Sequence, residues 1–457
     1  MNILGKSYVE LLGLLNSKKI STKELHEYFS KREKKYNKEL NVFLTLAENP
    51  GVEGEMPLAY KDNYNTEGIR TTASSKVLDS YISPYDATVV ERLKKSKTYV
   101  FGKTNLDAWA HGASTETSDY GATKNPWDTS RVPGGSSGGS AAATASYLMP
   151  ATIGSDTGGS IRCPASWCGV VGLKPTYGRV SRYGVIAMGS SFDCPGPLSW
   201  HVEDCALLLS HMAGFDPYDA TTSSKPVPAY MEKLNAEKKL KIGIAESFFE
   251  NVDKEVKKKI EEALEILRKM GHIEKKIKML NPKHALSAYT ILQRSEVSSN
   301  LGRYDGIRYG NDRSFFKEEA KKRIMLGTYT LSHGYYDQYY KKAQKVRALI
   351  IEDFKKAFDD VDIIIAPSTP STAVKLGEFK KYPFFGEQMD ILNEPANVSG
   401  IPSINIPVGL DSKRLPVGMQ IMGRQFDEET ILNVSYKFQR ETNFFNMRET
   451  LLKKYHD

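Results

Sequence analysis

Hydrophobic residues follow two spacings along the chain, and the alternation of these spacings indicates an α/β protein. Within residues 253–270, Val256 and Ile260 begin a row of apolar positions at helical spacing, which predicts an amphipathic helix. Short segments rich in apolar residues at 98–103 and 361–366 predict buried strands instead. Because segments of both kinds alternate along the chain, we expect helices packed against a sheet.

The N-terminal residues 1–45 have the pattern of two amphipathic helices packed on the outside of the core. Ser21 followed by Glu24 is typical of a capping box and predicts the start of the second helix. The chain contains no repeat, no low-complexity tract and no clear linker. We therefore expect a single domain over residues 1–457.

Composition narrows the functional classes only slightly. The chain carries 63 Lys and Arg against 55 Asp and Glu, a net charge of +8 that indicates a lysine-rich solvated surface and leaves contact with RNA open. No apolar run approaches the roughly 18 residues of a membrane span, and the N-terminus is too polar for a signal peptide. The cysteines form no CxxC pair and have no histidine at ligand spacing, so we predict reduced thiols, no metal site and a cytoplasmic location.

The stretch 133–162 contains the strongest chemical signal. It holds Ser136 and Ser160 in two glycine-rich turns, 24 positions apart, with a small-residue helix and a short strand predicted between them. Glycines beside a serine let a substrate approach the backbone closely. Successive N–H groups in such turns also form sites for an anion. A nucleophile and an oxyanion hole need both features.

Several interpretations of this stretch compete. A phosphate-binding P-loop is excluded because Ser140 stands where that motif requires lysine. A nucleophile elbow, GxSxG, would make Ser136 the nucleophile. In a Ser-Ser-Lys arrangement Ser160 attacks, Ser136 relays its proton and Lys61 is the base. A flexible Gly/Ser linker is disfavoured by the strands predicted on both sides.

Three separated blocks resemble the amidase signature family: KDN at Lys61, GGSSGGSAAA around Ser136, and GSDTGGSIRCPA around Ser160. Within that family, GVVGLKPTYGRVSRYGVIA and KKRIMLGTY resemble the glutamine-hydrolysing subunits of tRNA-dependent amidotransferases. The similar blocks extend over roughly residues 57–425. The resemblance implies a single large mixed β-sheet covered on both faces by helices.

The resemblance also implies roles for individual residues. Lys61 matches the general base, Ser136 the bridging serine after a cis peptide bond, and Ser160 the acyl-forming nucleophile. A lysine can act as a base only when it is neutral, and burial favours that state. The oxyanion would rest on backbone N–H groups of Ser160 and of the three residues before it, Thr157, Gly158 and Gly159.

The substrate's charged end requires partners of its own. The resemblance points to Arg323 for a carboxylate and to Asp390 for an α-ammonium group. Arg162 and Arg347 are expected to be structural. The segment around His111 departs from the more apolar loop of the family.

The resemblance further implies partners and a reaction. Glutamine, and asparagine more slowly, would supply ammonia to a B subunit that uses ATP and Mg²⁺, with a small C subunit completing a heterotrimer. The acceptor would be misacylated Glu-tRNA(Gln) or Asp-tRNA(Asn), and this chain would hold no cofactor itself. A stand-alone amidase acting on another small amide and a non-catalytic tRNA-binding scaffold are the alternatives.

Overall fold

The strands of the described residues form one mixed sheet of eleven strands. The computed structural model describes residues 3–48, 50–308, 310–381 and 384–456. The strands are β1 (Phe43–Leu46), β2 (Met56–Lys61), β3 (Thr98–Thr104), β4 (Ala151–Asp156), β5 (Val171–Lys174), β6 (Cys194–Ser199), β7 (Lys241–Ala245), β8 (Ile273–Ile277), β9 (Ile363–Pro367), β10 (Ser403–Leu410) and β11 (Pro416–Gly423). Their order across the sheet is β1-β3-β2-β4-β6-β5-β10-β11-β9-β7-β8.

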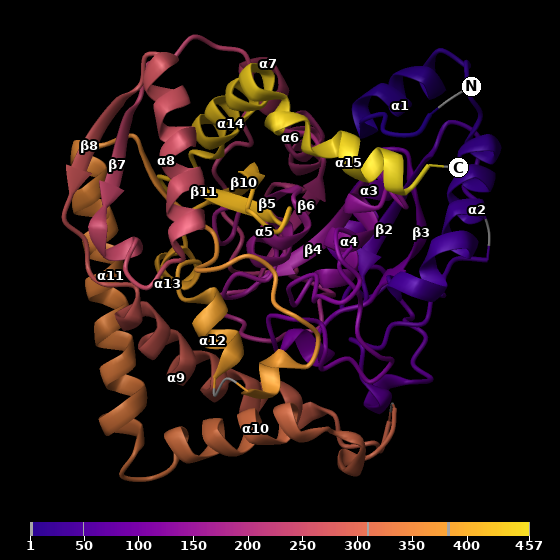
Figure 1. Ribbon diagram of the computed structural model, residues 1–457. Coiled ribbons are helices and arrows are strands. Elements are labelled where there is room, and N and C mark those ends of the chain that lie inside the picture. The colour runs from indigo at the N-terminus through magenta and orange to yellow at the C-terminus, as the bar shows by residue number, and fades with distance from the viewer. Residues whose placement is uncertain (1–2, 49, 309, 382–383, 457) are drawn as a thin grey trace.

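Helices cover both faces of this sheet. They are α1 (Tyr8–Asn16), α2 (Thr22–Leu40), α3 (Thr88–Lys95), α4 (Gly138–Ala145), α5 (Arg162–Cys168), α6 (Val202–Met212), α7 (Tyr230–Lys233), α8 (Lys254–Lys269), α9 (Lys283–Asn300), α10 (Glu318–Leu331), α11 (Lys342–Asp360), α12 (Phe385–Asp390), α13 (Glu394–Ser399), α14 (Glu428–Thr442) and α15 (Met447–Lys454). Figure 1 shows α6, α14 and α15 above the sheet and α9, α10 and α12 below it. The predicted α/β class with one large mixed sheet is confirmed.

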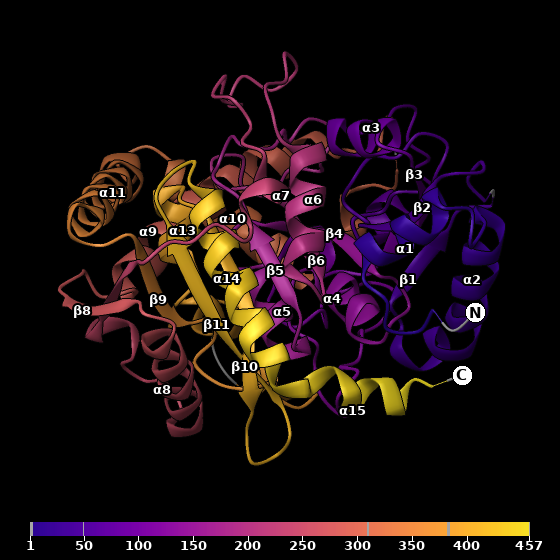
Figure 2. The ribbon, with the colours of Figure 1, turned by 90° about the horizontal axis from the view of Figure 1, so that it is seen from above.

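The parallel and antiparallel pairs divide the sheet into regions. β2 runs parallel to both β3 and β4, and β7 runs parallel to both β8 and β9. The central strands β4, β6, β5, β10, β11 and β9 pair antiparallel. Seen from above, α8 and β8 lie at one end of the molecule, and α1 and α2 lie at the other (Figure 2).

The long periodic segments fold as their patterns predict. The row that includes Val256 and Ile260 is buried in α8, whose opposite face carries the charged residues. The predicted strands at 98–103 and 361–366 appear as β3 and β9, and both are buried along their whole length. The Ser21 capping box is present at the start of α2.

The expectation that residues 1–45 are helical throughout is wrong at its C-terminal end. Asn41 adopts a left-handed conformation, with φ of 52°, and ends α2. The chain then forms β1, which pairs antiparallel with β3 at the edge of the sheet. The Asn37 side chain accepts hydrogen bonds from the backbone N–H groups of Val42 and Phe43 and so stabilises this change of direction.

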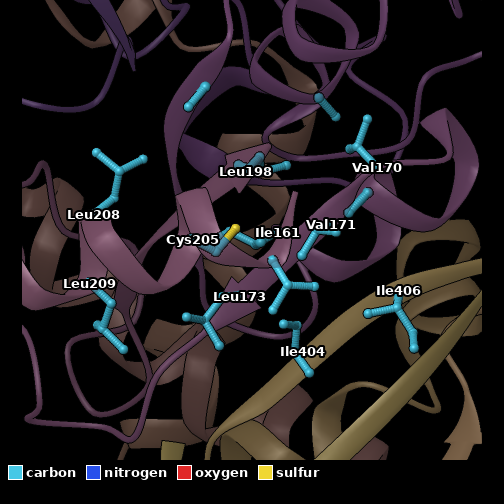
Figure 3. Packing of buried hydrophobic residues seen from close by; sticks show 14 of the residues in the cluster. Ile161, Val170, Val171, Leu173, Leu198, Cys205, Leu208, Leu209, Ile404 and Ile406 are labelled. Carbon is cyan, nitrogen blue, oxygen red and sulfur yellow. The ribbon is translucent and has the colours of Figure 1, made fainter. Parts of the chain in front are cut away.

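The core lies between the sheet and its helices, and Figure 3 shows one part of it. Leu209 of α6 lies toward Leu173 of β5, and Ile404 of β10, the strand partner of Leu173, lies beside it. These side chains are almost completely removed from water. Their burial contributes on the order of 2 kcal/mol each and keeps α6 against the sheet. The four cysteines are buried free thiols.

Candidate active site

The site forms where β2 and β4 end. These strands run parallel, with Tyr60 beside Ile153, so their C-terminal ends meet at the same edge of the sheet. Lys61 is the last residue of β2 and Asp156 is the last residue of β4. The loops that follow and precede these strands therefore bring the predicted residues together.

Lys61 is completely buried, and its amine lies among hydroxyl groups. Nζ donates to Ser136 Oγ at 2.7 Å, to Ser155 Oγ at 3.0 Å and to the Ser155 carbonyl at 3.2 Å. Burial lowers the pKa of Lys61 from its ordinary 10.5 to about 7, although nearby carboxylates oppose the shift. An amine with this pKa is neutral in a large fraction of molecules at neutral pH. Its lone pair can then accept a proton from Ser136.

Ser136 lies in a tight turn that packs directly against the Ser160 loop. The peptide bond between Gly135 and Ser136 is cis, as the family resemblance implies. The Ser137 N–H donates to the Ser160 carbonyl at 3.0 Å, which ties the two serine loops together. Within the described residues, no hydrogen bond joins the side-chain hydroxyls of Ser136 and Ser160. Lys61 thus hydrogen-bonds directly to Ser136, whereas Ser160 lies on the neighbouring loop.

The backbone after β4 has the features of an oxyanion hole. None of the N–H groups of Gly158, Gly159 and Ser160 donates a hydrogen bond to another described residue. A Cβ atom on Gly158 would lie 2.8 Å from the Tyr289 ring, so a larger residue does not fit there. The side chain of Thr157 is fixed by a hydrogen bond, because its Oγ1 donates to Asp193 Oδ1 at 2.6 Å.

A small cavity opens from Ser160 between helices of the lower layer. Its polar lining includes Tyr289, Gln293, Arg323, Glu387, Asp390 and Glu394. Arg323 is buried, and its Nε and Nη1 donate to Glu319 at 2.6 Å and to Gln293 at 3.1 Å. The Nη2 edge of the Arg323 guanidinium is without a hydrogen-bond partner among the described residues.

Asp390 closes the same cavity from the end of α12. Its side chain lies so close to Gly159 that a Cβ atom there would collide with Oδ1. This Oδ1 atom is buried and has no hydrogen-bond partner among the described residues. Burial, and next the nearby Asp156, raises the pKa of Asp390 well above its ordinary range. A cation bound in the cavity would stabilise its ionised form.

Arg162 and Arg347, the two arginines expected to be structural, both lie in fixed networks. Arg162 is fully buried and pairs with Asp156 at 3.1 Å. Arg347 donates from Nε to the Val398 carbonyl at 3.1 Å, and its guanidinium lies over the Phe192 ring. Neither arginine lines the cavity beside Ser160.

Several residues of the site are not predicted by the sequence motifs. Ser155 accepts from Lys61 and from Asn63 Nδ2, and its only signal is its position inside the GSDTGGS block. Asp193 supports Thr157, and burial raises its pKa to about 6. Glu394, within NEPAN, carries no recognisable signal.

His111 lies in the loop that differs from the more apolar loop of the family. Its side chain is 1% exposed, and neither ring nitrogen has a hydrogen-bond partner among the described residues. Burial first, and the charges of Arg323 and Arg294 next, hold the pKa of His111 well below its ordinary value. The histidine is therefore neutral, and the loop does not add positive charge to the site.

The described residues offer neither a metal cluster nor a membrane span. No group of three or more His, Cys, Asp or Glu side chains is arranged there to hold a metal ion. None of the helices described has the length and apolar character needed to cross a bilayer.

Comparison with known proteins places this geometry in context. Residues 24–432 match the protein family described as Amidase. The chain is 46% identical over 474 residues to the A subunit of the glutamyl-tRNA(Gln) amidotransferase of Sulfurihydrogenibium sp. strain YO3AOP1, covering 96% of this chain and 98% of that protein.

Two solved structures extend the comparison. The crystal structure of the glutamyl-tRNA(Gln) amidotransferase A subunit from Thermotoga maritima superimposes with a TM-score of 0.85 at 39% identity, covering 97% of this chain and 96% of that one. A peptide amidase from Stenotrophomonas maltophilia superimposes with a TM-score of 0.82 at 27% identity, covering 96% of this chain and 97% of that one.

Proposed function

Because the chain belongs to the amidase family, we propose that it is the glutamine-hydrolysing A subunit of a tRNA-dependent amidotransferase. The resemblance carried by the three sequence blocks is confirmed at the level of the family. The observation that carries the choice of glutamine is the cavity beside Ser160, which holds both Arg323 and Asp390. A free amino acid brings one carboxylate and one ammonium group, and these two residues complement that pair of charges.

The reaction begins with proton transfer along the hydroxyl groups. Neutral Lys61 accepts the Ser136 proton while Ser136 accepts the proton of Ser160, whose Oγ attacks the side-chain amide carbon of glutamine. The C–N bond then breaks, and the nitrogen leaves as ammonia with the proton returned through Ser136. The γ-glutamyl ester on Ser160 is hydrolysed by water, which yields glutamate and restores the serine.

Charge on the carbonyl oxygen develops next to the Gly158–Ser160 backbone. The unoccupied N–H groups would donate to this oxyanion, together with that of Thr157. The loss of one such donor typically slows a reaction roughly 10²- to 10³-fold. Because Asp193 holds Thr157 from behind, the donors are positioned before the substrate arrives.

The ammonia is proposed to pass to a partner. The B subunit of the complex would hold ATP and Mg²⁺ and convert Glu-tRNA(Gln), or Asp-tRNA(Asn), to the amidated form, and the C subunit would complete a cytoplasmic heterotrimer. This chain's own residues hydrolyse the glutamine and hold no cofactor in the proposal. The similarity to the Sulfurihydrogenibium protein over 96% of the chain supports the assembly.

The test separates this function from that of a stand-alone amidase. We expect the purified chain to release little ammonia from glutamine until the B and C subunits are added. In the assembled enzyme, Arg323→Ala should raise the KM for glutamine on the order of 100-fold, because a charged carboxylate loses its partner. Arg347→Ala is the control, since Arg347 lies outside the cavity. Strong activity of the lone chain on an uncharged amide, unaffected by Arg323→Ala, would favour the stand-alone amidase.

A further inference from the structure

The cavity beside Ser160 contains an acid that the proposed mechanism does not use. Glu394 is the first residue of α13, is 1% exposed and lines this cavity. Neither of its carboxyl oxygens has a hydrogen-bond partner among the described residues. Such an arrangement is unfavourable in the free protein, because a buried acceptor without a donor loses its contacts with water.

Neither neighbouring arginine hydrogen-bonds to Glu394, and each forms an ion pair with another acid. Arg323 binds Glu319, and Arg294 forms an ion pair with Glu387. Burial, and next the nearby Asp390 and Glu387, raises the pKa of Glu394 well above its ordinary value, while Arg294 and Arg323 oppose the shift. The cavity therefore presents an acid that lacks a cation.

Glu394 and Asp390 together offer three acceptor atoms. Asp390 lies four residues earlier and lines the same cavity. Asp390 Oδ1 and the two Oε atoms of Glu394 are buried carboxyl oxygens, and all three lack a hydrogen-bond partner among the described residues. A primary ammonium group has three N–H donors, so its hydrogen-bonding capacity equals this set.

We propose that Glu394 is a specificity-determining residue, which binds the α-ammonium group of the amino-acid substrate together with Asp390. This inference rests on the proposed glutamine hydrolysis and adds a second acid to the single acid, Asp390, invoked there. Two acids around the α-ammonium group favour a substrate that carries it strongly over one with a neutral group or only hydrogen at the same carbon. The pocket then rejects amides that have the carboxylate but lack the amine.

The alternative role for such an acid is to hold the departing ammonia. Substrate choice separates the two roles, because every amide releases ammonia but only an amino acid carries the α-ammonium group. L-glutamine and 4-carbamoylbutanoate form a matched pair, since the second is glutamine without its α-amino group. The quantity to measure is the ratio of their kcat/KM values in the enzyme assembled with the B and C subunits.

Glu394→Gln keeps the shape of the side chain but removes one acceptor and its charge. We expect the KM for L-glutamine to rise roughly 10- to 100-fold, with kcat changed much less, as for a lost charge-assisted hydrogen bond. The kcat/KM for 4-carbamoylbutanoate should stay within about threefold of wild type, so the ratio falls. Glu387→Gln is the matched control, because Glu387 lines the same cavity but is paired with Arg294. It should change both substrates equally.

Thermal unfolding of each variant shows whether it folds, and Glu394→Asp provides a second variant whose carboxyl is withdrawn by one methylene. A ratio that is unchanged in either folded variant, or equal losses for both substrates, would overturn the role of Glu394 and leave glutamine hydrolysis intact. A wild-type enzyme that releases no ammonia from L-glutamine would overturn the proposed function and this inference with it.

Discussion

The rate of glutamine hydrolysis should depend on pH through Lys61. Burial lowers its pKa from 10.5 to about 7, so roughly half of the molecules hold a neutral amine at pH 7, against about one in three thousand for an ordinary lysine. The neutral fraction grows from about a tenth at pH 6 to about nine tenths at pH 8. We therefore expect kcat/KM for glutamine to rise nearly tenfold over this interval and then level off.

The assay is ammonia release by the assembled enzyme across the same pH range. Asp193 is the nearest complication, because its pKa of about 6 lies close to the expected midpoint and it supports Thr157. Asp193→Asn removes that titration and should leave the midpoint near 7. A rate that does not change between about pH 6 and pH 8, or a midpoint above about pH 9, would refute the role of Lys61 as a neutral base.

The same shift has a consequence for stability. Between the folded pKa of about 7 and the ordinary value of 10.5, the unfolded chain binds a proton at Lys61 that the folded chain does not. The free energy of unfolding should therefore rise with pH in this window, by up to about 1.4 kcal/mol per pH unit from this residue. Urea unfolding of wild type and Lys61→Met, compared across the window, should show a smaller slope in the variant.

Two further predictions concern the nucleophile and a second buried lysine. Rapid quenching with glutamine, followed by peptide mass mapping, should find the acyl group on Ser160, whereas acyl on Ser136 would support the nucleophile elbow. Lys103 lies 3.4 Å from Asp62, and both side chains are fully buried. Lys103→Met leaves Asp62 as an unpaired buried charge and should lower the free energy of unfolding by about 3–5 kcal/mol, measured in urea. A loss below about 1 kcal/mol would contradict the importance of this pair.

The sequence predicted individual elements better than their arrangement. The apolar row of α8 and the unbroken run of β9 are local patterns, and burial of an element follows from them. The pairing of β5 with β10 depends on contacts between residues more than 200 positions apart, which no local pattern encodes. The start of β1 was missed because a single left-handed residue, Asn41, decides where the preceding helix ends.

At the site, the motifs predicted which residues lie together but not which hydrogen-bond partners each of them has. The contact between Lys61 and Ser136 follows from the two motifs that contain them. The part played by Ser155 could not be predicted, because a serine next to an aspartate is common and only the folded backbone aims its hydroxyl at Lys61.

Glu394 shows most clearly what the sequence cannot predict. What distinguishes it from other acids is the lack of a cationic partner, which its residue type does not reveal. Four acids and two arginines of the described residues meet around the cavity beside Ser160, and the sequence does not show which acid pairs with which arginine. Only the structure shows that Glu319 and Glu387 occupy the two arginines and leave Glu394 without one. An acid isolated in this way, beside a nucleophile, points to a cation that arrives with the substrate.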